Sequence, residues 1–129
     1  MRLAFISSIH FLELGKLGDI EFNLAPFILR YKHYAQYFTD AAAEGRFVLM
    51  DNGAAEGELL EAYALLRIAE ETQPSEVVAP DVLYDGASTI DTTHDFIERV
   101  RKSSYKGQVL AVPQGKTASE YVGCAYVLS

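Results

Sequence analysis

Four short apolar segments are spread along the chain, each of a length typical of a buried strand. They span residues 3–6, 47–50, 77–79 and 109–112. None of them alternates between apolar and polar residues, which favours strands that are buried on both faces of a parallel sheet. The segment 7–23 has no regular period and contains Gly15 and Gly18, so it predicts a long loop with at most one short turn of helix.

Helical periodicity fills the intervals between these apolar segments. Apolar residues recur at helical spacing over 26–45, over 58–72, from about residue 90 to before Gly107, and over 117–128. Strand and helix therefore alternate four times, which predicts an α/β fold in one domain, with parallel βα units and helices covering the sheet. Two architectures fit this order: a small doubly wound sheet, or the first half of an eight-unit TIM (β/α) barrel.

Polar residues follow three of the four predicted strands, at the point where each strand ends. They are Asp51, Asn52 and Gly53 after the second strand, Asp81 after the third, and Gln114 and Gly115 after the fourth. Because the carboxyl ends of parallel strands meet at one rim of a sheet, we expect two carboxylates and one amide to face a common pocket. An aspartate at such a position is more often a turn residue or a helix cap, so the functional interpretation depends on the coincidence of three equivalent strand ends.

The net charge of the chain argues against a role as a nucleic-acid clamp. Eighteen acidic and eleven basic residues give a formal charge of −7 at pH 7, which opposes contacts with phosphate groups. The single cysteine, Cys124, excludes an intrachain disulfide, fits a reducing compartment such as the cytoplasm, and is interpreted as a small buried hydrophobic residue. The sequence has no credible export signal and no run of roughly 20 apolar residues, so we expect no membrane partner.

Other groups of residues have simpler explanations. Residues 115–117 resemble the end of a phosphate-binding loop, but Leu110 stands where that motif needs its first glycine. The three histidines have no ligand spacing with one another, so no metal site is expected within the chain. Tyr31, Tyr34 and Phe38 recur at helical spacing, which is more typical of core packing than of a base-stacking surface.

In their order and spacing, the strand-end segments resemble motifs of one known family. Segments 47–54, 77–81 and 112–115 are similar to the tRNA-guanine transglycosylase superfamily, and look most like its compact relatives that insert 7-deazaguanine bases into DNA in phages and bacteria. The resemblance implies that the chain is the first half of a TIM barrel. It also implies a transferase activity of the glycosyltransferase class. The enzyme would exchange guanine for a 7-deazaguanine, either in tRNA, as in queuosine formation, or in DNA.

The resemblance gives the first of these segments a role in catalysis and substrate binding. Asp51 falls on a family aspartate to which a general acid/base or base-positioning role is attributed. Asn52 and Gly53 follow it as expected substrate-binding residues, and Ala54 completes a segment that reads D-S-G-G in the family.

The other two segments are expected to hold the base. Asp81 falls on the family aspartate that grips the Watson–Crick edge of the purine, and Gln114 and Gly115 fall on a segment whose glutamine contacts the base. Lys116 stands in place of that segment's second glycine. A carboxylate can accept two hydrogen bonds from the N1–H and the exocyclic amine of guanine, an arrangement that rejects adenine.

In the family, the nucleophilic aspartate and a zinc site with three cysteines and a histidine come later in the sequence. We therefore expect both to lie beyond Ser129, and we expect the present chain to be a truncated or split form with base recognition, little turnover and no cofactor of its own. The expected partners are a purine or 7-deazaguanine base, and tRNA or DNA through the missing half. A second copy or a complementing second half is the expected protein partner.

Two other functions fit the sequence. A self-contained α/β module that binds a small ligand without covalent chemistry explains the length of the chain directly. A barrel-type lyase or aldolase needs a Schiff-base lysine or metal ligands at the strand ends, and Lys116 is the one candidate lysine.

Overall fold

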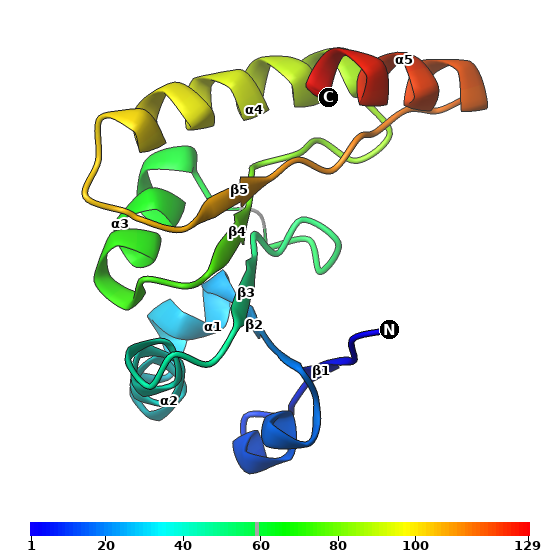
Figure 1. Ribbon diagram of the computed structural model, residues 1–129. Coiled ribbons are helices and arrows are strands. Elements are labelled where there is room, and N and C mark those ends of the chain that lie inside the picture. The colour runs from blue at the N-terminus through cyan, green and yellow to red at the C-terminus, as the bar shows by residue number, and fades with distance from the viewer. Residues whose placement is uncertain (59) are drawn as a thin grey trace.

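The computed structural model describes residues 1–58 and 60–129 of the chain (Figure 1). The strands are β1 (Ala4–Ile6), β2 (Ile20–Leu24), β3 (Val48–Asp51), β4 (Glu76–Val78) and β5 (Gln108–Leu110). The helices are the 3-10 helix η1 (Leu12–Leu17) and the α-helices α1 (Ala25–Arg30), α2 (Lys32–Ala43), α3 (Ala62–Thr72), α4 (Gly86–Arg101) and α5 (Ala118–Leu128).

All five strands are parallel and follow one another across the sheet in the order β1-β2-β3-β4-β5. The prediction of a parallel α/β fold is therefore confirmed. A doubly wound sheet reverses its strand order at a switch point, whereas this sheet continues in one direction across all its strands. The helices follow the same progression, because each α-helix contacts the next one along the chain. Figure 1 shows α1, α2 and α3 together on one side of the sheet.

Most of the strand β2 lies in the segment 7–23, where the sequence pattern predicts a loop, and this prediction was wrong. The reason is that the residues of β2 that point to the core are polar. Glu21 is 3% exposed and Asn23 is 0% exposed, whereas the apolar residues Ile20 and Phe22 are only half-buried. A pattern search that looks for apolar residues on the buried face cannot find such a strand.

Three predicted helices have different bounds in the structure. The helix expected from about residue 90 to before Gly107 spans Gly86–Arg101 as α4. The helix expected over 26–45 is divided into α1 and α2 by Tyr31, whose backbone is extended at φ −125° and ψ 106°. The helix expected over 58–72 begins at Ala62, and the expected place of Leu59 on it lies outside the described residues.

The core lies between the sheet and its helices. The register aligns Met50 of β3 with Val77 of β4, and both side chains are fully buried beneath the helical layer. Tyr34 and Phe38 of α2 are buried in the same core, which confirms the interpretation of the aromatic stripe as a packing feature. The Tyr34 hydroxyl accepts a hydrogen bond from the Leu24 N–H at 3.0 Å, and burial raises the pKa of Tyr34 to about 12.

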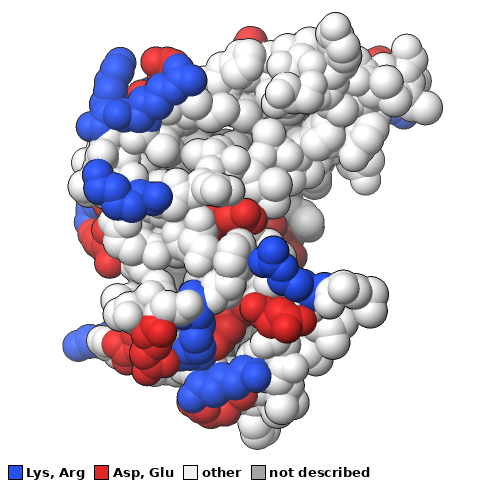
Figure 2. Space-filling view, viewed as in Figure 1, with Lys and Arg blue, Asp and Glu red and all other residues white. Residues whose placement is uncertain are grey.

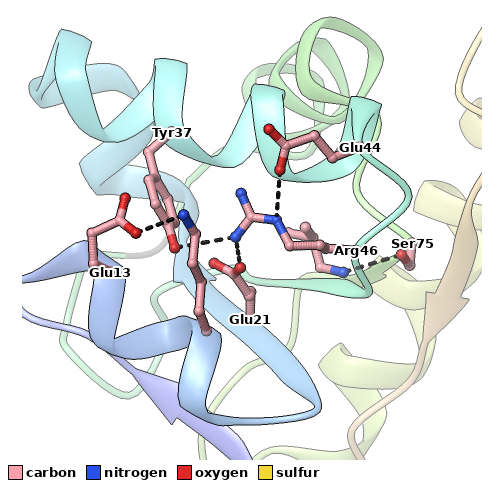
Figure 3. A network of polar contacts seen from close by, with 8 residues as sticks. Glu13, Glu21, Tyr37, Glu44, Arg46 and Ser75 are labelled. Carbon is pink, nitrogen blue, oxygen red and sulfur yellow. Dashed lines mark hydrogen bonds and ion pairs between the residues drawn. The ribbon is translucent and has the colours of Figure 1, made fainter.

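A charged network holds the amino ends of β2 and β3 (Figure 3). The Arg46 guanidinium forms an ion pair with Glu21, a second ion pair with Glu44 at 3.1 Å, and a hydrogen bond to the Tyr37 hydroxyl at 3.2 Å. A buried carboxylate such as Glu21 requires a counter-charge, which Arg46 supplies. This network lies at the opposite end of the strands from the predicted site residues, so we interpret it as structural.

Candidate functional site

The residues that follow β3, β4 and β5 meet at one buried carboxylate. Asp81 is 4% exposed, and each of its oxygens accepts a hydrogen bond from a side-chain amide. The Asn52 Nδ2–H donates to Oδ1 at 2.7 Å, and the Gln114 Nε2–H donates to Oδ2 at 2.6 Å. The structure thus brings together side chains that are 29 and 33 residues from Asp81 in the sequence. We call Asn52, Asp81 and Gln114 the Asp81 cluster.

Asn52 uses its whole side chain inside the protein. Both hydrogens of Nδ2 are engaged, one by Asp81 and one by the Ala79 carbonyl at 2.7 Å. Its Oδ1 accepts the Ala54 N–H at 2.8 Å, and the residue is 1% exposed. Asn52 therefore orients the Asp81 carboxylate and has no N–H left for a ligand.

Gln114 is held at both ends of its amide and retains one free donor. Its Oε1 accepts the Tyr84 N–H at 3.3 Å, while Nε2 donates one hydrogen to Asp81. The second hydrogen of Nε2 has no acceptor among the residues that the structure describes. Gln114 is half-buried, so this N–H is the donor that the cluster can offer to a bound molecule.

Asp51 lies at the end of β3, next to the cluster. Its Oδ1 accepts the Gly53 N–H at 2.8 Å, and the side chain is half-buried. Burial raises the pKa of Asp51 above its ordinary value, the Gly53 N–H lowers it, and the negative charges of Glu56 and Asp81 raise it further. A carboxyl group whose pKa is raised above its ordinary value is better suited to donate and accept protons, as a general acid and base must.

We expect Asp51→Asn to be more stable than the wild-type protein at pH 7. A raised pKa means that the folded state binds the Asp51 proton more tightly than the unfolded chain does, so ionisation of this residue lowers the free energy of unfolding as the pH rises. The two proteins should therefore converge in acid, near the pKa of about 3.9 that an unfolded aspartate has. Urea unfolding at several pH values measures this, with Asp91→Asn on the exposed face of α4 as the matched control. A lower stability of Asp51→Asn at pH 7 contradicts the expectation.

The two predicted glycines of the site have packing roles. Gly53 has a positive φ of 83°, and a Cβ atom there would lie 2.6 Å from Cγ of Pro26 in α1. At Gly115 a Cβ atom would lie 2.4 Å from the backbone nitrogen of Tyr121 in α5. Both positions therefore need glycine to let a loop of the site approach a neighbouring helix.

Two hollows of the molecule lie near the Asp81 cluster rather than around it. A cavity of about 550 Å³ lies between α4 and α5 and is lined by Tyr84 and Lys116 among others. A groove of about 440 Å³ lies between α3 and α4, with Pro80 in its wall. Neither hollow is lined by the Asp81 or Gln114 side chain.

Cys124 is buried, as the sequence predicts, with its Sγ 3.6 Å from the Gly86 carbonyl. Among the described residues, no three histidine, cysteine, aspartate or glutamate side chains are placed to hold a metal ion. Within that same part of the chain, no helix has both the length and the apolar character needed to cross a bilayer.

The fold and the cluster define a parallel α/β protein with a carboxylate and two amides at the carboxyl rim of its sheet. Comparison of the chain with family models, curated proteins and solved structures gave no match.

Tyr84 is the residue of this region that the sequence pattern did not single out. Its N–H holds Gln114, and its backbone has a positive φ of 65°. Positive φ is uncommon for a residue other than glycine, and an aromatic residue carries no sequence signal for it.

Proposed function

We propose that this chain recognises the guanine-type edge of a purine or 7-deazaguanine base, as part of a base-exchange enzyme of the tRNA-guanine transglycosylase kind. The observation that carries the proposal is the hydrogen-bonding pattern of the Asp81 cluster. A carboxylate that can accept stands beside the free N–H of Gln114, and the half-buried Asp51 lies nearby.

The pattern of donors and acceptors is complementary to guanine. Each Asp81 oxygen accepts one amide hydrogen and has a further lone pair, so the carboxylate can accept the N1–H and the 2-amino group of the base. The free N–H of Gln114 can then donate to the 6-oxo group. Adenine presents a donor at position 6 and an acceptor at N1, which places like groups opposite one another. The cluster therefore favours 6-oxo purines that carry a hydrogen on N1.

Base exchange also needs proton transfer and a nucleophile. The proposal gives Asp51 the proton transfer to and from the base, because its raised pKa suits that role. Exchange without hydrolysis requires a second carboxylate that attacks C1′ of the sugar and holds the covalent intermediate. The proposal leaves that nucleophile, the zinc site of the tRNA enzymes and most contacts with tRNA or DNA to further βα units.

We also propose that a protein partner covers part of the surface of this chain. The proposed compartment is the cytoplasm. Figure 2 shows a largely uncharged surface at the end of the molecule formed by α5, which carries Glu120 as its one charged residue. Apolar residues are exposed at the first edge of the sheet and towards the end of the chain; they are Leu3, Ile6, Leu14 and Leu17 in or near β1 and η1, Leu110 in β5, and Val122, Tyr126 and Val127 in α5. Further βα units, from a second copy or a complementing half, can cover such surfaces.

Calorimetric titration with 7-deazaguanine tests the proposal. We expect wild-type protein to bind this base, and Asp81→Asn to lose at least tenfold in affinity, because one acceptor of a charge-assisted pair becomes an N–H donor. Adenine should bind at least tenfold more weakly than guanine to the wild-type protein.

The matched control for this titration is Asp91→Asn, which makes the same chemical change on an exposed face of α4 and should keep wild-type affinity. A folded wild-type protein that binds neither 7-deazaguanine nor guanine contradicts the proposal. Equal affinity of wild type and Asp81→Asn removes Asp81 from the site.

A second candidate function is a self-contained module that binds a small ligand without covalent chemistry. The cavity between α4 and α5 favours it, because about 550 Å³ is within the usual size range of small-molecule sites. Ile90 lines this cavity, and Ile90→Trp should fill it. Screening of small metabolites by thermal shift, with and without this substitution, distinguishes the candidate from base recognition at the Asp81 cluster. Shifts that disappear in Ile90→Trp support the module, whereas shifts that depend on Asp81 support the base site.

A further inference from the structure

The loop between β4 and α4 contains a backbone conformation that needs an explanation. Tyr84 has φ 65°, in the left-handed region, where a residue with a Cβ atom is disfavoured by roughly 1–2 kcal/mol. Among the described residues, Gln73, which caps the end of α3, is the one other non-glycine residue with positive φ. Unlike Gln73, Tyr84 does not end a helix, so helix termination does not account for its conformation.

Tyr84 contributes its backbone N–H to the Asp81 cluster. The side chain of Tyr84 is 66% exposed, and the residue lines the cavity between α4 and α5. Its N–H donates to Gln114 Oε1 at 3.3 Å. The backbone conformation of Tyr84 therefore affects the position of Gln114 through this one hydrogen bond, and the tyrosine ring takes no part in it.

This hydrogen bond acts together with Asp81 to define which way the Gln114 amide faces. A reversed amide would place its oxygen against the Asp81 carboxylate and its NH2 group against the Tyr84 N–H. Both contacts would join like groups, acceptor to acceptor and donor to donor. With Tyr84 and Asp81 in place, the free group that Gln114 presents is an N–H donor.

We propose that Tyr84 is a positioning residue that holds Gln114 as a donor and thereby sets the preference of the site for 6-oxo over 6-amino purines. The inference rests on the proposed function for its ligand, but the orientation of Gln114 is measurable without one. The left-handed backbone of residue 84, rather than the tyrosine ring, is what orients the Gln114 amide. The identity of the side chain should matter only through the backbone conformations that it allows.

Three substitutions separate the backbone from the ring. Tyr84→Gly and Tyr84→Asn both remove the ring, and both allow positive φ. Tyr84→Val also removes the ring, but its branched Cβ disfavours that conformation and turns the N–H away. We expect the ratio of affinities for guanine and 2,6-diaminopurine to fall roughly three- to tenfold in Tyr84→Val, the effect of losing one hydrogen bond. The ratio should stay within about twofold of wild type in the glycine and asparagine variants.

A loss of affinity for both purines by the same factor in Tyr84→Val overturns the inference, because a general structural role has that effect. An equal fall of the ratio in Tyr84→Asn also overturns it, because the ring is then responsible. Thermal unfolding of all four proteins establishes that each is folded.

The side-chain amide of Gln114 provides a readout that does not depend on ligand. In ¹⁵N spectra of the ligand-free proteins, we expect the Gln114 NH2 protons to exchange slowly with water in wild type and Tyr84→Asn, and faster in Tyr84→Val. Equal exchange in all three proteins overturns the inference. If exchange differs as expected while wild type binds no purine, the positioning role of Tyr84 stands and the proposed function fails.

Discussion

Asp81→Ala is expected to lower the free energy of unfolding by about 2–4 kcal/mol, because the Asp81 carboxylate is the acceptor that joins the three strand-end loops. The substitution removes two hydrogen bonds, one from Asn52 and one from Gln114. It also leaves an N–H of Asn52 buried without an acceptor, since Asn52 is 1% exposed. Urea unfolding of wild type and variant measures the difference.

Asp91→Ala provides the control for this experiment, since Asp91 is an exposed residue of α4 and its loss should change stability by no more than about 0.5 kcal/mol. A double-mutant cycle with Asn52→Ala should show coupling, because the two residues share a hydrogen bond of 2.7 Å. A loss below about 1 kcal/mol in Asp81→Ala would show that the cluster does not hold the loops together.

Gly53→Ala is expected to destabilise the protein by about 2–4 kcal/mol, for two separate reasons. An alanine at φ 83° pays the cost of the left-handed region, and its Cβ atom overlaps Pro26 at 2.6 Å. Because Gly53 joins Asn52 to the loop that packs on α1, the substitution should also weaken binding at the Asp81 cluster. Urea unfolding and calorimetry measure the two effects.

Gly45 offers a matched control for Gly53, because its φ is 79° and nothing lies within 4 Å of the position of a Cβ atom. Gly45→Ala should therefore cost only the backbone term, roughly 1–2 kcal/mol. The difference between the two substitutions isolates the contact with Pro26. Equal losses at the two positions contradict the packing role that we assign to Gly53.

The fold class could be predicted because three of the strands lie in apolar segments, of which β3 and β4 are buried and β5 is largely exposed. The segments 47–50, 77–79 and 109–112 are apolar throughout, and each overlaps an observed strand, β3, β4 or β5. The carboxyl ends of those strands could then be located to within about two residues. This was sufficient to place Asp81 and Gln114 at the same rim.

The second strand of the sheet, β2, could not be predicted in the same way. In β2 the fully buried positions hold Glu21 and Asn23, and the cost of burying the Glu21 charge is offset by Arg46, which lies 25 residues later in the sequence. A local pattern contains no information about such a distant partner. The strand was therefore mistaken for part of a loop.

The identity of the cluster residues was predictable, but the arrangement of their hydrogen bonds was not. The positions of Asn52 and Gln114 after their strands made both candidates for base contact. The structure shows that Asn52 has its hydrogen bonds satisfied within the protein, whereas Gln114 retains a donor. That difference depends on backbone groups of Ala79 and Tyr84, whose directions follow from dihedral angles rather than from residue type.

The most direct test of the Asp81 cluster as a base site is a titration of 7-deazaguanine into protein with ¹⁵N in its asparagine and glutamine side chains. The predicted result is a saturable shift of the Gln114 Nε2 resonance, because its free N–H acquires the base as an acceptor. A smaller shift of Asn52 Nδ2 should follow through their shared partner, Asp81. Saturation that leaves both amides unchanged, with shifts confined to the cavity between α4 and α5, would contradict the account.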